Sequence, residues 1–160
     1  MPKYYFESPS DLLNKTKRDY ERIKKAYGMI NENPDLLADH FFNFCITAFS
    51  IRDWLKNSNS CSFDEVKNYL EGNEFLSACR DICNTSKHYE LLPNAERISV
   101  TESVETTVVR HNGMYRRNDE VNYTGKTITV RLKNGSSYPL NEFCTSIIGA
   151  WESFFASNNI

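Results

Sequence analysis

Apolar residues recur at three- and four-residue steps in the first half of the chain, as expected of amphipathic helices. The first such helix begins at Ser8-Pro9-Ser10-Asp11, where Ser8 as N-cap, Pro9 at the first helical position and Asp11 at the third form a capping signature. Lys and Arg lie opposite its apolar stripe, which consists of Leu13, Thr16, Tyr20, Ile23 and Tyr27. Gly28 lies near the predicted end of this helix.

A second helix is predicted from Asn33-Pro34 to about Asn57. Its main apolar stripe consists of Leu37, Phe41, Phe44, Ala48, Ile51 and Leu55. Further apolar residues lie on its other sides, namely Phe42, Ile46, Phe49 and Trp54. A helix that is apolar around most of its circumference is either central to the core or covered on its second side by a partner. We expect both for this helix.

Two shorter helices follow. The run Ser62-Phe63-Asp64-Glu65 is a capping box for a short helix through Tyr69 and Leu70. Gly72-Asn73 ends that helix, and a further helix is predicted from Glu74 to about Lys87. Pro93 ends the helical part of the chain.

The pattern then changes to strands. Residues 98–132 are rich in Val, Thr, Ile and Tyr with alternation, and Asn112-Gly113 and Asn134-Gly135 are hairpin-turn signals. Asn141 is the predicted cap of a last helix, whose buried stripe is Phe143, Ile147, Trp151 and Phe154. The predicted fold class is α+β: a bundle of about four helices, a small antiparallel sheet of three or four short strands, and a C-terminal helix packed on it.

The length of 160 residues fits a single domain over residues 1–160, with a helical part (8–92), antiparallel strands (96–140) and a closing helix (141–157). The net charge is −2, so no bulk attraction to nucleic acid or anionic membrane is implied. The charge is uneven: residues 1–28 carry seven basic and four acidic side chains, whereas residues 29–90 carry five and ten. This asymmetry indicates complementarity within the chain or between protomers; a basic docking face on the first helix is the less favoured interpretation.

The cysteine content indicates the compartment. Five cysteines are an odd number with no disulfide-scaffold spacing, which favours a reducing environment. The N-terminus has no signal-peptide pattern, and the richest apolar run, Phe41 to Ile51, is too short to span a bilayer. We therefore expect a cytoplasmic protein with no membrane partner.

The helix from Glu74 to His88 concentrates the polar chemistry. Arg80, Asn84 and His88 are spaced four residues apart and form one stripe opposite the apolar face, while Lys87 flanks it beside Arg80. Asp81 lies almost in line with His88. A carboxylate can orient an imidazole, and Arg and Lys can hold a phosphate, so this set could perform acid–base chemistry on a phosphodiester without a metal. The alternative is a solvated polar face with ordinary helix charge pairs.

Other candidates are weaker. Arg52, late in the second helix, could reach into the groove between helices and bind substrate, or simply pack along its aliphatic stem. Cys79 and Cys83 lie on the apolar face of their helix and are expected to be small buried hydrophobes rather than metal ligands. The chain contains no glycine-rich phosphate loop, HExxH, CxxC or GxSxG motif and no DNA-reading signature. We expect no metal and no cofactor.

The segment from Cys79 to His88, following a long helix that contains Ile51-Arg52-Asp53-Trp54-Leu55, resembles HEPN-type helical domains. It is most similar to an uncharacterised bacterial group with an Asn-x-x-Lys-His helix end. The resemblance covers about residues 8–92, and the strands and final helix are an addition. It implies a homodimer with an Arg and a His of a late helix in a cleft between protomers. Many such proteins are metal-independent RNases of toxin–antitoxin or phage-defence systems, and others are inactive binding modules.

Two functions follow as expectations. In the first, the chain is a homodimeric RNA-binding protein or metal-independent RNase: Arg80 and His88 are catalytic, Asp81 orients His88, and Asn84, Lys87 and Arg52 bind substrate. The resembling motif usually has four to six residues between Arg and His, whereas here there are seven. On a regular helix Arg80 and His88 are then separated by about 12 Å along the helix axis. One phosphate could meet both only if the helix ended before Lys87, or if they came from different protomers. In the second function, the chain is a non-catalytic interaction module that binds itself or a partner protein through the aromatic residues of the second helix.

Overall fold

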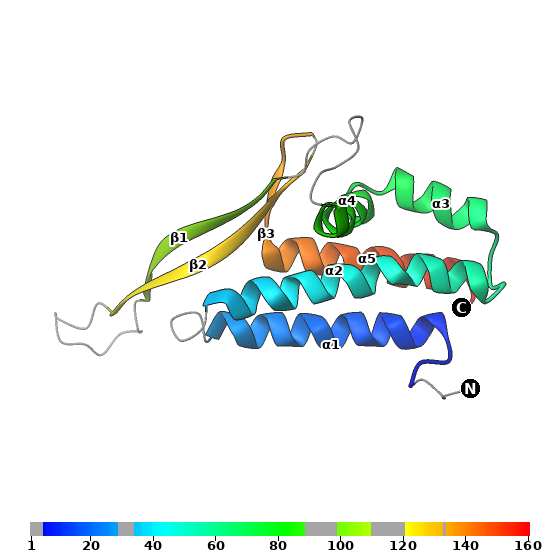
Figure 1. Cartoon of the computed structure of the whole chain (residues 1–160), viewed down its shortest axis with the longest axis horizontal. Coiled ribbons are helices and arrows are strands. Elements are labelled where there is room, and N and C mark those ends of the chain that lie inside the picture. The colour runs from blue at the N-terminus through cyan, green and yellow to red at the C-terminus, as the bar shows by residue number, and fades with distance from the viewer. Residues whose placement is uncertain (1–4, 29–33, 89–98, 110–120, 133) are drawn as a thin grey trace.

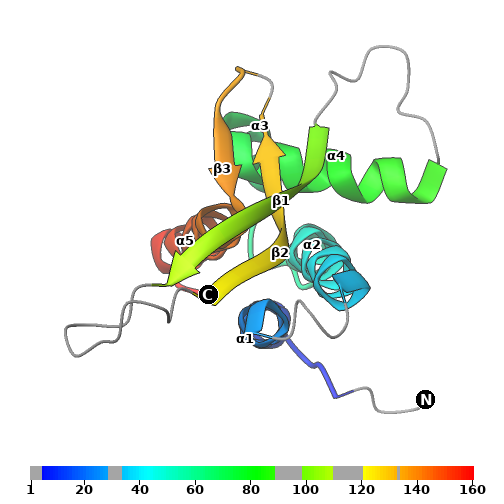
Figure 2. The ribbon, with the colours of Figure 1, turned by 90° about the vertical axis from the view of Figure 1, so that its left-hand side faces the viewer.

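A computed structural model of the chain describes residues 5–28, 34–88, 99–109, 121–132 and 134–160, and within these it gives the backbone alone for residues 28, 34, 85–88, 99–109 and 121–128. The helices are α1 (Pro9–Gly28), α2 (Pro34–Asn57), α3 (Phe63–Gly72), α4 (Glu74–His88) and α5 (Leu140–Asn158). Seen end on, α1, α2 and α5 form a three-sided bundle, and α4 crosses over it (Figure 2). The predicted α+β class is confirmed.

The strands form one antiparallel sheet in the order β1-β2-β3. β1 (Ser99–Val109) pairs with β2 (Val121–Arg131) from Ser99 opposite Arg131 to Val109 opposite Val121. β3 (Ser137–Pro139) adds three residues at the base of β2. The strands were expected to be short, but β1 and β2 have eleven residues each and extend away from the helices (Figure 1).

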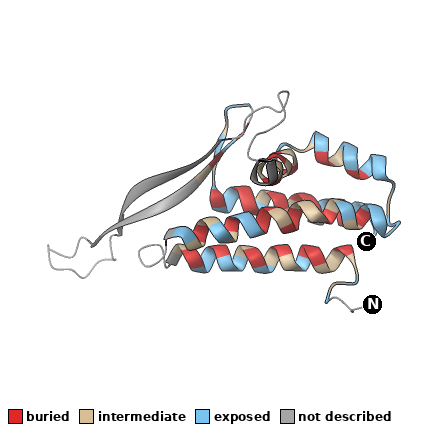
Figure 3. Ribbon diagram, viewed as in Figure 1, coloured by how far each residue is buried: buried red, intermediate tan, exposed pale blue. Residues whose placement is uncertain are grey.

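One continuous hydrophobic core joins the predicted helical part to the C-terminal helix. α2 supplies its central residues, among them Phe44, Ile51 and Leu55, all fully buried. α5 does more than cover the sheet, because Trp151 and Ile147 are fully buried in the same core. The buried positions face inward along each helix of the bundle (Figure 3). The residues that were predicted as an addition to the helical part therefore complete its core.

Local signals determined most of the helix ends. The Ser8 and Asp11 side chains cap α1, and the predicted capping box of α3 is present, with Ser62 and Glu65 bonded to each other's backbone. The Asn134-Gly135 turn joins β2 to β3, with Gly135 at a φ of 85°, in the left-handed region that suits glycine. The predictions at Pro93 and Asn112-Gly113 lie outside the described residues.

The cap predicted for the last helix is wrong. α5 begins at Leu140, its N-cap is Pro139, and no side chain caps it. Pro139 also ends β3, opposite Thr129 of β2. The strand therefore runs directly into the helix, and Asn141 lies inside the first turn.

A polar network crosses the contact between α1 and α2. The Asp19 carboxylate, on a residue that is 2% exposed, accepts hydrogen bonds from Lys15 Nζ at 2.7 Å and from the Thr47 hydroxyl at 2.9 Å. Lys15 Nζ also donates to Thr47 at 2.6 Å, and Arg22 pairs with the other carboxylate oxygen. Because these bonds join side chains of two helices, they favour one register of α1 against α2. In the described part of the chain, no helix combines the length and apolar character needed to cross a membrane.

We predict that Asp19→Ala lowers the free energy of unfolding by about 2 kcal/mol, because it leaves the partly buried Lys15 ammonium without its carboxylate. Chemical denaturation measures this change. Glu21→Ala is the matched control on the same helix, since Glu21 forms an exposed pair with Lys24 at 2.5 Å. Its effect should stay within about 1 kcal/mol. Equal effects for the two variants would contradict the structural role of Asp19.

We also predict a pH-dependent contribution from the α1 cap. Hydrogen bonds from the Glu7 backbone N–H, the Ser8 hydroxyl and the Ser8 backbone N–H lower the pKa of Asp11 below its ordinary 3.8. A lowered folded-state pKa means that the stabilisation is present above the unfolded-state pKa and is lost as the pH falls through the folded-state value. The stability gap between wild type and Asp11→Asn should therefore shrink between pH 5 and strongly acidic pH. If denaturation experiments gave the same stability difference between the two proteins at every pH, the prediction would be contradicted.

Candidate functional site

α4 carries most of the predicted site residues, and its N-terminal cap and its buried face determine its position. The Asn73 side chain caps it by accepting hydrogen bonds from the backbone N–H groups of Phe75 and Leu76, both at 3.0 Å. Its buried face, with Cys79 and Cys83, packs against α2, where Cys79 Sγ donates to the Cys45 carbonyl at 3.3 Å. The helix is thereby held across the bundle.

Arg80 and Asp81 form an ion pair between adjacent residues of α4. Arg80 Nε donates to Asp81 Oδ1 at 2.8 Å. Asp81 is only 4% exposed, whereas the Arg80 side chain retains 27% of its exposure. Sequence periodicity placed Asp81 on a face opposite the core, and that expectation is wrong for this residue. A buried carboxylate here fixes the direction of the Arg80 side chain.

The geometry of Arg80 suits an anion. The bond to Asp81 uses Nε, and within the described part of the chain no hydrogen bond engages the two terminal amino groups of the guanidinium. These are the groups that bind phosphate or carboxylate oxygens in a forked geometry. Asn84, one helical turn further on, is half-buried on the same side of α4. Arg80 and Asn84 are thus two polar groups on one partly exposed edge of α4.

The side chains of Lys87 and His88 lie outside the described residues, so the predicted contact between Asp81 and His88 stays a prediction. The backbone, however, is helical through His88. The helix therefore does not end before Lys87, and Arg80 and His88 of one chain are two turns apart, about 12 Å in rise. An early end of the helix therefore cannot bring Arg80 and His88 to one phosphate. They could meet at one phosphate only if they came from different protomers.

Arg52 belongs to another surface. Its guanidinium lies over the ring of Phe49, 4.4 Å from the centroid, and donates twice to Asp53, at 2.8 and 3.0 Å. No hydrogen bond or ion pair among the described residues joins it to Arg80 or Asn84. The structure therefore supports the packed alternative for Arg52 over its predicted role as a substrate ligand beside Arg80.

The buried cysteines have the properties of apolar core residues. Cys45, Cys79, Cys83 and Cys144 are fully buried, and no group of three or more His, Cys, Asp or Glu side chains in the described residues is arranged to hold a metal ion. Burial raises the pKa of Cys45 and Cys144 above the ordinary 9.0, so these thiols stay protonated and unreactive at neutral pH. The burial of Cys79 and Cys83 confirms the prediction that these two are small buried hydrophobes.

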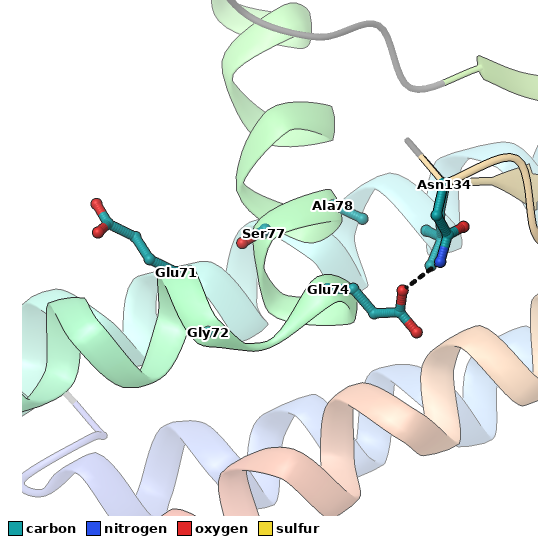
Figure 4. A pocket seen from close by; sticks show the side chains of 7 residues that line it. Glu71, Gly72, Glu74, Ser77, Ala78 and Asn134 are labelled. Atoms are coloured by element: carbon teal, nitrogen blue, oxygen red, sulfur yellow. Dashed lines mark hydrogen bonds between the residues drawn. The ribbon is translucent and has the colours of Figure 1, made fainter.

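A separate pocket of about 280 Å³ lies where α3 meets α4, beside the turn between β2 and β3 (Figure 4). Glu71, Glu74, Ala78 and Leu132 are among the residues that line it, and the Asn134 side-chain amide donates to Glu74 at 2.8 Å. The sequence predicted the Asn134 turn but contained no signal that would bring it to Glu74. Two carboxylates in the lining do not define a ligand, so we assign none.

The chain was compared with protein-family models, with curated proteins and with solved structures, and it matches none of them. Its function must therefore be inferred from the residues themselves.

We predict that Asp81→Ala destabilises the fold by about 2 kcal/mol, because it removes the acceptor that a half-buried arginine needs. Asp53→Ala is the matched control: it removes the acceptor of the other Arg-Asp pair, where Asp53 is 53% exposed. Its cost should be below about 1 kcal/mol. Thermal or chemical denaturation of both variants tests this, and a reversed order would contradict the assignment.

Proposed function

We propose that the chain is a homodimeric nucleic-acid-acting protein that binds single-stranded RNA along the exposed edge of α4. The observation that carries this proposal is the fixed Arg80, whose Nε is bonded to the buried Asp81 while its side chain stays 27% exposed and its terminal amino groups form no hydrogen bond with a described residue. An arginine that is oriented before the ligand arrives loses less conformational entropy on binding. The resemblance of this helix to HEPN-type domains agrees with such a role.

In this proposal Arg80 contacts one phosphate and Asn84 contacts the neighbouring sugar or phosphate. Since Asp81 balances the charge of Arg80 and the chain carries a net charge of −2, binding depends on local geometry more than on bulk attraction. Lys87 supplies the further positive charge near the end of the same helix. We expect modest affinity that weakens with salt in proportion to these few contacts.

Cleavage would be the stronger form of the same function. His88 is the proposed acid–base group, and Arg80 the group that stabilises charge on the phosphate, without a metal. Because the two residues of one chain are separated by two helical turns, the proposal requires Arg80 of one protomer and His88 of its partner at each site. Homodimerisation is therefore part of the proposed mechanism.

A non-catalytic interaction module is the second candidate. The observation in its favour is an apolar strip on the outward side of α2, where Phe42 is 40% exposed. Exposed aromatic residues are enriched at protein interfaces. In this alternative the α4 edge has no nucleic-acid role, and Arg80 and Asp81 serve the fold.

The two candidates differ in how they respond to Arg80→Ala. If RNA is the ligand, we expect binding of a fluorescent single-stranded RNA to weaken by about tenfold or more, measured by fluorescence anisotropy at low salt. Arg18→Ala is the matched control, because it removes the same charge from an exposed position on α1. It should change binding by no more than about twofold. An unchanged affinity for Arg80→Ala would reject the RNA proposal.

Cleavage of the same RNA is measured on a denaturing gel in the presence of EDTA. Wild type should cut the RNA, and His88→Ala should retain binding while losing cleavage. Binding without cleavage by wild type would leave an RNA-binding protein and reject the RNase. If wild type neither bound nor cut RNA, the non-catalytic interaction module would be favoured.

A further inference from the structure

The arm formed by β1 and β2 has an open edge along β1. The order β1-β2-β3 puts β1 at one side of the sheet, and its residues pair with β2 without a bulge from Ser99 to Val109. Among the described residues, no strand pairs with the other side of β1 and no helix makes more than marginal contact with it. In an antiparallel strand that is paired on one side, every second residue directs its backbone N–H and C=O groups away from the partner strand. β1 therefore presents a row of backbone donors and acceptors to a further strand.

The outer part of the arm consists of two strands. β3 pairs only with Thr129 to Arg131 at the base of β2. Residues 102–109 of β1 and 121–128 of β2 thus form a ribbon that has no third strand in the described part of the chain, and it extends away from the helices (Figure 1). A two-stranded ribbon is marginally stable in water, and three or more strands are needed for stability. A further strand on the β1 edge would supply what the ribbon lacks.

The sequence of β1 is compatible with a reversed copy of itself. When two copies of β1 run antiparallel with Val104 at the centre, all eleven residues have an opposite residue. From the centre outward, the opposite pairs are Val104 with Val104, Ser103 with Glu105, Glu102 with Thr106, Thr101 with Thr107, Val100 with Val108 and Ser99 with Val109. Apolar residues meet apolar residues except at the two ends, and no acid lies directly opposite another acid. The least favourable contact is between the two copies of Glu105, which are diagonal neighbours about 7–8 Å apart.

The neighbouring registers lose this match. Opposite residues of antiparallel strands lie on the same face of the sheet, so the twofold axis must pass through a residue. An axis at Ser103 puts Val104 opposite Glu102, and an axis at Glu105 puts the two copies of this acid directly opposite each other. Like charges in that position are destabilising. The register centred on Val104 is therefore favoured.

The outer edge of β2 does not offer the same match. It is open only over residues 121–128, because β3 covers the rest. Gly125 lies in the middle of this stretch and weakens a strand. An axis at Gly125 would put Asn122 opposite Ile128, and an axis at Lys126 would put two cations opposite each other. The match thus selects β1.

We propose that β1 is a dimerisation edge, on which β1 of a second copy of this chain pairs antiparallel about a twofold axis at Val104. The two arms then form one sheet with the strand order β2-β1-β1-β2. Both copies use the same surface, as an isologous twofold dimer requires. Strand addition at an open edge gains its affinity from main-chain hydrogen bonds. The inference goes beyond the proposed function: it names an interface between two copies and depends on no residue of the α4 edge.

Opposite charges at Thr106 test the register. Thr106 lies opposite the partner's Glu102 in the proposed dimer and opposite Thr124 within its own arm. Thr106→Lys should therefore tighten dimerisation by about fivefold and Thr106→Glu should weaken it by about the same factor, since each change acts twice in a twofold dimer. Within the arm, Lys126 is a diagonal neighbour of Thr106, so effects on the arm itself have the opposite sign. Light scattering over a concentration series measures the dimer dissociation constant.

Thr124→Glu is the matched control on the same arm. It adds the same charge on β2, two strand spacings or about 10 Å from the partner strand. It should change the dissociation constant by less than about twofold. Circular dichroism checks that all variants are folded.

A disulfide cross-link locates the axis directly. Opposite residues of antiparallel strands have Cα atoms about 4.5–5.5 Å apart, within the range of a disulfide. Val104→Cys should thus form a covalent dimer on mild oxidation with oxidised glutathione, in a Cys61→Ser background that removes the one native cysteine that is not fully buried. Thr124→Cys in the same background is the control, because its two copies would be three strand spacings or about 14 Å apart. It should remain uncross-linked.

A wild type that is monomeric at micromolar concentration would overturn the proposal and leave the edge to a strand of another protein. Changes of the same sign for Thr106→Lys and Thr106→Glu would overturn it too, as would equal cross-linking of Val104→Cys and Thr124→Cys. RNA binding is measured separately through Arg80. The expected responses at Thr106 combined with no effect of Arg80→Ala would retain the interface and reject the RNA function; the reverse combination would do the opposite.

Discussion

Burial of α2 is the constraint on which the remainder of the structure depends. This helix is apolar around most of its circumference, and α1, α3, α4 and the base of β2 all contact it. Removing so much apolar surface from water is the dominant favourable term in folding. Each neighbouring element is therefore positioned by the side of α2 that it covers, and the side that carries Phe42 is left partly exposed.

The contact between α1 and α2 shows how polar groups are accommodated beside such a helix. Asp19 is buried, but it is bonded to two cations and to the Thr47 hydroxyl. A buried charge is tolerated only when it is paired and hydrogen-bonded. The network restricts α1 to one register, which a purely apolar contact would specify less strictly.

The same dipeptide, Arg-Asp, occurs on α2 and on α4 with different consequences. On α2, Asp53 is exposed, and the Arg52 guanidinium stacks on an aromatic ring. On α4, Asp81 is buried and accepts a hydrogen bond from Arg80 Nε, while the Arg80 side chain is partly exposed. Arg52 donates to Asp53 through Nε and a terminal amino group, whereas Arg80 donates to Asp81 through Nε alone. The surrounding elements determine how far each arginine is packed.

Local interactions explain what the sequence by itself determined. The starts of α1 and α3 and the Asn134-Gly135 turn depend on side chains within about four residues of one another, so their patterns could be recognised directly. Helical periodicity likewise indicated the buried faces of α2 and α5. The spacing of Arg80, Asn84 and His88 on one helix was evident for the same reason.

Only the tertiary structure decided which residues of these faces are covered. The burial of Asp81, the bond between Glu74 and Asn134 and the place of α5 in the bundle all depend on elements distant in the sequence. Helical periodicity assigns a residue to a side of its helix but does not state what packs there, so Asp81 was placed with the exposed polar residues. The candidate site was thus found from the sequence, and its fixed arginine was defined by packing.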